Sequence, residues 1–190
     1  MSKTVPSINA RLQGISDAIG TFPDFPKKGI NFRDIFGALR NPSITRDLLD
    51  ELKLMIRQNV LSVHPKIDAV IGIDARGFLF GLTLSCELNC GFVPVRKSGK
   101  LPGPCYSVSY ALEYGEAEVE IQKDALKPGD KVILVDDLLA TGGSLNAASE
   151  LVRKSGAIPV AAVVVMELDK LNGREKLESS SVAVHSLLLC

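Results

Sequence analysis

The sequence predicts an α/β fold in which a mainly parallel central sheet is flanked by helices. Short apolar segments alternate with amphipathic segments along most of the 190 residues. Residues 132–135 form a continuous run of β-branched and apolar side chains, which is typical of a central strand covered on both faces. A glycine-rich turn at 141–143 then leads into a segment with helical periodicity. We find no internal repeat, and the length suits a single domain spanning 1–190.

Two helices and an intervening loop are predicted for the N-terminal segment. Residues 8–19 place apolar side chains on one helical face, and a glycine follows as a natural stop. Prolines remove backbone donors and fix φ, so residues 22–29 are expected to be loop or extended chain. Asn41 and Pro42 have the residue types of an N-cap and a first helical turn, and the apolar stripe that follows predicts a helix through Ile56.

Buried strands and a buried helix are predicted next. The apolar run 67–73 reads as a strand, residues 78–88 are apolar on nearly all sides and read as a helix, and residues 92–95 read as another short strand.

A basic loop and a hairpin follow. Residues 96–104 contain too much Gly and Pro for regular structure, so we expect a mobile loop. Alternating side chains in 106–112 and 116–121 predict an antiparallel hairpin that interrupts the parallel unit.

The C-terminal part continues the alternation. After the strand at 131–135 we expect a helix over 144–155 and strands over 158–166 and 182–189, with a charged stretch at 169–178 between the two strands.

Composition excludes several classes of protein. The 22 Lys and Arg balance the 22 Asp and Glu, so no large nonspecific field for nucleic acid exists and any anion site must be local. The N-terminus lacks the apolar core of a secretion signal, and no apolar run approaches the roughly 20 residues of a membrane helix. The four cysteines lack Cys-x-x-Cys spacing and are expected to be free thiols. We therefore expect a cytoplasmic protein with no nucleic-acid or membrane partner.

The strand-to-helix corner at 136–144 is the strongest candidate site. A glycine-rich turn that opens a helix directs unpaired N–H groups and the positive helix end at one point, which suits a phosphate group. Hydroxyls can add donors to the phosphate, whereas carboxylates should accept hydrogen bonds from ribose hydroxyls or hold a cation. The predicted ribose 5-phosphate site comprises Asp136, Asp137, Ala140, Thr141, Gly142, Gly143 and Ser144.

Other interpretations of this corner are weaker. The acids could merely cap a turn and the glycines merely make a bend. The thirteen consecutive residues 132–144, which include the preceding strand, all suit a phosphate site and favour that interpretation. A Walker loop at Gly99 and Lys100 fails because Pro94 and Leu101 occupy required positions. Dinucleotide, serine-hydrolase and zinc-protease motifs are absent from the sequence.

Residues 132–144 resemble the phosphoribosyl-pyrophosphate motif of type I phosphoribosyltransferases. Further segments are similar, in the same order, to the adenine phosphoribosyltransferase family, although Asn31, Ala75 and the chain beyond Ser179 depart from its pattern. These segments are residues 22–26, 31–35, 73–81, 95–103 and 110–115. The resemblance implies the type I phosphoribosyltransferase fold, with an N-terminal hood at about 1–40 that binds the base and a flexible catalytic flap at about 98–121.

The resemblance also implies a reaction. Adenine and 5-phosphoribosyl 1-pyrophosphate would give AMP and pyrophosphate, a step of purine salvage. The leaving pyrophosphate gathers negative charge, so its expected ligands are cations that would otherwise be read as solvated surface residues. These are Arg76, Arg96, Lys97 and Lys100, of which Arg76 and Lys100 are also expected to be catalytic. Mg2+ is implied as a cofactor held mainly through the pyrophosphate, and we assign no protein metal ligand.

The remaining roles also follow from the resemblance. Glu113 is the candidate acid or base for the adenine proton, and Tyr114 belongs to the flap that excludes water. Phe32 would stack on adenine while the backbone from Asn31 to Arg33 reads its edge, although a core role for Phe32 is the alternative. A homodimer is expected. A transferase for a 6-oxopurine, or a non-catalytic regulator that senses phosphoribosyl pyrophosphate, are the alternative functions.

Overall fold

The computed structural model describes residues 8–111 and 116–190. The chain divides into two compact units, Met1–Leu54 and Met55–Cys190, each with its own internal contacts. All the strands of the large sheet belong to the second unit.

The described residues of the first unit form three helices and a two-stranded ribbon. Asn41 accepts hydrogen bonds from the backbone N–H groups of Ser43 and Ile44 at 3.0 and 3.4 Å, which confirms the predicted N-cap. The sequence prediction missed the ribbon, which is antiparallel, and the one-turn helix α2. The elements are α1 (Ile8–Ala18), β1 (Gly20–Pro23), β2 (Asn31–Asp34), α2 (Phe36–Leu39) and α3 (Pro42–Met55).

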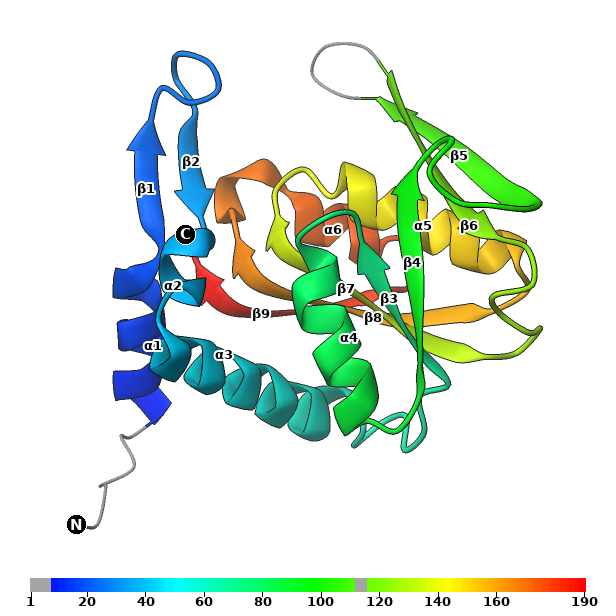
Figure 1. Cartoon of the computed structure of the whole chain (residues 1–190), viewed down its shortest axis with the longest axis horizontal. Helices are drawn as coiled ribbons and strands as arrows, with labels where there is room; N and C mark the ends of the chain where they lie inside the picture. Colours follow the sequence, from blue (N-terminus) through cyan, green and yellow to red (C-terminus); the bar gives the residue numbers. More distant parts are fainter. Residues whose placement is uncertain (1–7, 112–115) are drawn as a thin grey trace. The chain divides into compact units, whose positions relative to one another are not determined.

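The second unit is built on a seven-stranded sheet with the order β5-β6-β4-β3-β7-β8-β9. Neighbouring strands from β4 to β9 are parallel, and the hairpin β5-β6 joins β4 antiparallel, so the predicted fold class is confirmed (Figure 1). The strands are β3 (Ala69–Ile73), β4 (Gly91–Lys97), β5 (Cys105–Ala111), β6 (Glu116–Gln122), β7 (Lys131–Leu139), β8 (Ile158–Glu167) and β9 (Ala183–Leu189). The helices are the π-helix η1 (Ile56–Val60), α4 (Gly77–Glu87), α5 (Gly143–Lys154), the 3-10 helix η2 (Asp169–Leu171) and α6 (Gly173–Glu178).

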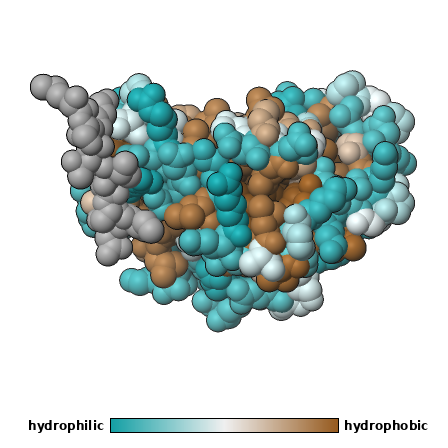
Figure 2. All heavy atoms as spheres, turned by 90° about the horizontal axis from the view of Figure 1, so that it is seen from below, coloured by the Kyte–Doolittle hydropathy of each residue, from teal (hydrophilic) through white to brown (hydrophobic). Residues whose placement is uncertain are grey.

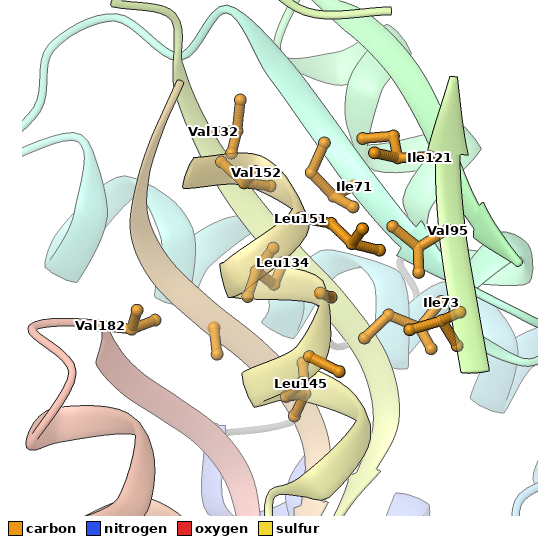
Figure 3. Packing of buried hydrophobic residues seen from close by; sticks show 14 of the residues in the cluster. Ile71, Ile73, Val95, Ile121, Val132, Leu134, Leu145, Leu151, Val152 and Val182 are labelled. Carbon is orange, nitrogen blue, oxygen red and sulfur yellow. The ribbon is translucent and has the colours of Figure 1, made fainter. Parts of the chain in front are cut away.

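The core of this unit lies between the sheet and α5. Leu145 and Leu151 of α5 and Ile71 and Leu134 of the sheet are buried in one apolar cluster (Figure 3). Burying a side chain of this size stabilises a fold by about 1.5–3 kcal/mol. The strands that carry the site are therefore held by a well-packed interior.

The strand order places a topological switch between β3 and β7. From β3 the chain crosses through α4 to β4 on one side, and from β7 it crosses through α5 to β8 on the other. Gly72 pairs with Val135, so the two carboxyl ends are adjacent. Ligands of open α/β sheets bind at such a point.

Two strands are longer than predicted. β7 runs to Leu139, so Asp136 and Asp137 lie in the strand itself, and β4 runs to Lys97. Arg96 and Lys97 pair with Glu120 and Val119 of β6 rather than lying in an irregular loop. Strand pairing with β6, which lies far away in sequence, extends β4 beyond its apolar run.

Several hydrophobic residues are exposed at the surface. On the face seen in Figure 2, hydrophobic atoms emerge in several patches between hydrophilic residues. Helix α4 buries Phe80 and Leu84 but exposes Leu79 and Leu82, so its all-round apolar sequence does not correspond to burial on every side. Among the described residues no helix is both long and apolar enough to cross a membrane.

Candidate active site

The corner between β7 and α5 has the geometry of an anion site. Gly142 has a φ of 75°, a left-handed conformation that favours glycine, and α5 begins at the next residue. The first N–H groups of a helix have no intrahelical partners, so they point outward at this corner. Thr141 is exposed and Ser144 is half-buried, so the Thr141 hydroxyl is accessible beside these donors.

Ser144 also contacts the hairpin. Its hydroxyl lies 3.1 Å from the hydroxyl of Tyr110 on β5, so one of the two groups donates a hydrogen bond to the other. The sequence prediction did not include Tyr110 in the site. Only the fold reveals this contact, because β5 packs on α5.

The two acids at the end of β7 form a close pair. The backbone N–H of Asp137 donates to the carboxylate of Asp136 at 2.9 Å, and the Asp137 side chain is only 2% exposed. Burial, followed by the neighbouring charge of Asp137, raises the pKa of Asp136 well above its ordinary value. Within the described part of the chain, Oδ1 of Asp137 is buried and has no hydrogen-bond partner. The pair therefore has acceptor capacity that a hydroxyl donor or a cation would satisfy.

Arg76 joins the β3 loop to this acid pair. Its Nε donates to Oδ2 of Asp137 at 2.5 Å, and its side chain is 38% exposed, so part of it faces solvent. A Cβ at Gly77 would overlap the carbonyl oxygen of Val135, so glycine allows the start of α4 to approach β7 closely. The peptide bond between Asp74 and Ala75 in the same loop is cis.

Arg96 connects the end of β4 to both neighbouring loops. Its Nε donates to Asp74 at 3.1 Å and its Nη1 donates to the carbonyl oxygen of Lys100 at 3.1 Å. Lys97 and Lys100 have exposed side chains on the same edge of the sheet. Of the predicted cations, Arg96 and Lys97 thus end β4, Lys100 follows it, and Arg76 follows β3.

Glu120 anchors the start of the basic loop and was not predicted from the sequence. Its buried carboxylate accepts the backbone N–H groups of Lys100 and Leu101 at 2.9 and 2.8 Å. Burial alone would raise the pKa of Glu120, but the N–H donors of this turn lower it below its ordinary value. Glutamates in alternating sequence usually face solvent, so nothing in the local pattern indicated this role.

Comparisons with known proteins identify the family. The model of the phosphoribosyl transferase domain matches residues 43–187. The adenine phosphoribosyltransferase of Drosophila pseudoobscura pseudoobscura is 51% identical over 182 residues, which cover 96% of this chain and 97% of the relative. The chain belongs to the adenine phosphoribosyltransferase family.

Solved structures of adenine phosphoribosyltransferases share the fold. The Saccharomyces cerevisiae structure, a complex with an iminoaltritol bisphosphate and adenine, has a TM-score of 0.88 and 46% identity and covers 95% of this chain and 99% of its own. The Trypanosoma brucei structure, in complex with AMP, pyrophosphate and ribose 5-phosphate, has a TM-score of 0.80 and 26% identity and covers 100% of this chain and 82% of its own. The predicted family and fold are confirmed.

The residues predicted to bind the base lie in the first unit. Asn31, Phe32 and Arg33 form most of β2, with Asn31 exposed and Phe32 half-buried. The rings of Phe25 and Phe32 meet edge to face with centroids 5.2 Å apart. Nη1 of Arg33 donates to the Thr21 hydroxyl at 2.6 Å. Phe32 is therefore not a fully buried core residue, which was the alternative interpretation.

Two predicted residues of the flap, Glu113 and Tyr114, lie outside the described residues. The strands on either side form the predicted hairpin, with pairs from Cys105–Gln122 to Ala111–Glu116. At the base of the hairpin, Val108, Val119 and Ile121 are buried in the core of the second unit. The described part of the predicted flap thus contributes side chains to the core of the second unit.

Proposed function

We propose that the chain catalyses transfer of a phosphoribosyl group from 5-phosphoribosyl 1-pyrophosphate to adenine, giving AMP and pyrophosphate. The bond between C1 of the sugar and the pyrophosphate breaks, and a bond between C1 and N9 of adenine forms. The observation that carries the proposal is the corner at 136–144, where the left-handed Gly142 opens α5 and where, among the described residues, the buried Oδ1 of Asp137 accepts no hydrogen bond. Membership of the adenine phosphoribosyltransferase family supports it. No observation favours a 6-oxopurine transferase or a non-catalytic regulator.

The corner would hold the ribose 5-phosphate. The phosphate accepts from the backbone of 141–144 and from the hydroxyls of Thr141 and Ser144, as helix starts in general favour anions. Asp136 and Asp137 accept from the ribose hydroxyls, which would satisfy the unpartnered Oδ1 of Asp137. The carboxylates of Asp136 and Asp137 would face the ribose, so their negative charge would not repel the phosphate.

The pyrophosphate would leave toward the β3 and β4 ends. Arg76 and Arg96 are each bound through Nε to an aspartate, which fixes one side of the guanidinium group, while Lys97 and Lys100 are exposed. Cations placed where charge develops in the transition state accelerate such a step.

Mg2+ fits this site as an ion carried mainly by the substrate. The described residues contain no cluster of three or more His, Cys, Asp or Glu side chains, whereas Mg2+ is commonly bound by phosphates, waters and one or two carboxylates. Asp136 and Asp137 are the carboxylates in position to assist, through water or the ribose hydroxyls. When bound, the ion neutralises charge on the leaving pyrophosphate.

Base recognition and proton transfer complete the proposal. Phe32 offers a ring face to adenine, and a backbone carbonyl between Asn31 and Arg33 would accept from its 6-amino group, which a 6-oxopurine lacks. Glu113 takes the proton that N9 loses as its bond to C1 forms. Tyr114 belongs to the predicted flap, which would exclude water from the sugar cation.

We further propose a homodimer in the cytoplasm. The exposed Leu79 and Leu82 lie three residues apart on α4, so they form an apolar stripe that a second copy could cover. All four cysteines are free, as expected in a reducing compartment. Sedimentation analysis tests the dimer, and a Leu82→Glu variant is expected to shift it toward monomer.

A purine panel tests the proposed reaction. Purified protein is incubated with phosphoribosyl pyrophosphate, Mg2+ and adenine, hypoxanthine, guanine or xanthine, and released pyrophosphate is measured. We expect turnover with adenine. Turnover only with oxopurines would retain the mechanism and refute the substrate, and no turnover with any base would refute the enzyme.

A further inference from the structure

Gly173, the first residue of α6, packs against the backbone of the proposed phosphate corner. A Cβ at Gly173 would overlap the carbonyl oxygen of Ala140 and would lie 3.0 Å from the backbone nitrogen of Gly142. A Cβ at Gly142 would in turn lie 2.9 Å from the carbonyl oxygen of Gly173. Two glycine backbones therefore meet where a side chain on either would separate them.

Close approach, not backbone conformation, explains the glycine at 173. Gly142 has a positive φ, but Gly173 is not among the described glycines that do. Alanine is normally favoured over glycine in a helix by roughly 0.5–1 kcal/mol. The residue is thus less favourable for α6 itself, and its benefit lies in the contact with the corner.

An ion pair with the buried Glu167 ties α6 to the sheet. Arg174 donates from Nε and Nη2 to the two carboxylate oxygens of Glu167 at 2.8 and 2.5 Å, and from Nη1 to the carbonyl oxygen of Val184 at 2.7 Å. The Ser186 hydroxyl donates to the same carboxylate at 2.7 Å. Leu177 is fully buried in the core. Helix α6 is thereby fixed to the end of β8 and to β9.

The end of β8 also holds the start of the corner. Leu139 pairs with Glu167 across β7 and β8, and the carbonyl oxygen of Leu139 accepts the backbone N–H of Leu168 at 2.9 Å. At the other end, the carbonyl oxygen of Gly142 accepts the backbone N–H of Asn146 at 2.8 Å. Residues 140–142 are thus fixed at both ends, and Gly173 packs against the backbone of Ala140 and Gly142.

We infer that Gly173 is a positioning residue for the 5′-phosphate: held by the Glu167–Arg174 pair, it sets the backbone of 140–142 so that the N–H groups of the corner converge on the phosphate. Preorganised donors bind an anion more tightly than donors that must first be ordered. Gly173 itself makes no contact with the ligand. The inference rests on the proposed function, since it assumes that the corner binds a ribose 5-phosphate.

Calorimetric titration of Gly173→Ala with ribose 5-phosphate, and separately with Mg2+ pyrophosphate, tests the inference. We expect the dissociation constant for ribose 5-phosphate to rise at least about 10-fold, the equivalent of one or two weakened hydrogen bonds. Pyrophosphate, which the β3 and β4 loops would bind, should keep its affinity within about 2-fold. Gly91→Ala is the matched control, because a Cβ there makes only ordinary contacts at 3.8 Å or more, and it should change neither affinity.

Each outcome has a distinct meaning. Unchanged ribose 5-phosphate affinity in Gly173→Ala, or an equal loss for both ligands, would overturn the positioning role while leaving the proposed function intact. Failure of the wild-type protein to bind ribose 5-phosphate would overturn both. If thermal melting shows that Gly173→Ala does not fold, Arg174→Lys replaces it, because lysine keeps the charge and loses the bidentate bond. That variant should weaken ribose 5-phosphate binding about 3-fold and spare pyrophosphate, and any other pattern would overturn the inference.

Discussion

The adjacent strands β7 and β8 each carry a buried acid in their C-terminal part, and the two acids differ in how many of their oxygens accept hydrogen bonds. Glu167 on β8 and Asp137 on β7 are 4% and 2% exposed, and each is bound by an arginine. Both oxygens of Glu167 accept hydrogen bonds, whereas Oδ1 of Asp137 accepts none among the described residues. A fully satisfied acid strengthens the fold, while an unsatisfied buried oxygen lowers stability and leaves capacity for a ligand.

The two ends also differ in their pKa values. Burial favours the neutral form of Glu167, but the hydrogen bonds from Arg174 and Ser186 outweigh it and lower the pKa. At the β7 end, burial and the charge of Asp137 raise the pKa of Asp136. We therefore expect mutations at β8 to change mainly stability and mutations at β7 to change mainly activity.

The largest effect is expected for Glu167→Gln. Breaking a buried pair costs about 3–5 kcal/mol, but Arg174 is 36% exposed and can be solvated, so the free energy of unfolding should fall by about 2–4 kcal/mol. Because the folded pKa is lowered, this contribution is present above the ordinary pKa of Glu and is lost as pH falls through the folded pKa. Urea denaturation at neutral and acidic pH measures both effects.

Glu178→Gln is the matched control, because Glu178 pairs with the same arginine at 3.2 Å but is 48% exposed. Its free energy of unfolding should fall by less than about 0.5 kcal/mol. Equal losses in the two variants would show that burial does not distinguish these pairs.

The double variant Asp136→Asn with Asp137→Asn should lose at least about 10-fold in kcat/KM, because charge-assisted hydrogen bonds to the ribose are weakened. Steady-state kinetics with adenine and phosphoribosyl pyrophosphate measure this. Asp124→Asn, in the exposed turn after β6, is the control and should be fully active. Wild-type rates in the double variant would remove the acid pair from the site.

Asp136→Asn alone should raise the free energy of unfolding at neutral pH by about 0.5–2 kcal/mol, within the range of stabilising mutations at strained sites. The pKa of Asp136 in the folded protein lies above its ordinary value. The stability that Asp136 contributes is therefore present at pH values below the ordinary pKa, and it is lost as pH rises through the folded pKa. Chemical denaturation checks the sign. A variant less stable than wild type would show that the carboxylate is already satisfied in the free protein.

The smallest effect is a shift in the pH dependence. The pKa of Asp136 lies above the ordinary value for aspartate. As pH falls, kcat/KM should therefore begin to decline at a higher pH than it would with an aspartate of ordinary pKa. Asp137 and Arg76 face this group, and the charge of Arg76 limits the shift. The profile of Asp136→Asn should lack this decline, and an identical decline in both proteins would assign it to another group.

The sequence predicted the parallel sheet and the corner because both depend on local patterns. The apolar run before Asp136 and the glycines after Thr141 specify a strand, a turn and a helix within a short segment. Pairing between strands that are distant in sequence leaves no local pattern. The extension of β4 through Arg96 and the anchoring of the Lys100 backbone by Glu120 were therefore not predicted.

Helix α6 shows a second limit of sequence reasoning. It has six residues and one fully buried side chain, Leu177, so it is too short to give a helical period. Residues 169–178 therefore read as a charged stretch. The close approach of Gly173 to Gly142 became visible only when the fold brought them together.

A crystal structure of the protein with ribose 5-phosphate tests the central contrast most directly. We expect the phosphate on the backbone N–H groups of residues 141–144 and a ribose hydroxyl donating to Asp137, while Glu167 keeps its bonds to Arg174. A sugar phosphate bound elsewhere, with the corner empty and Oδ1 of Asp137 still without a partner, would contradict the account.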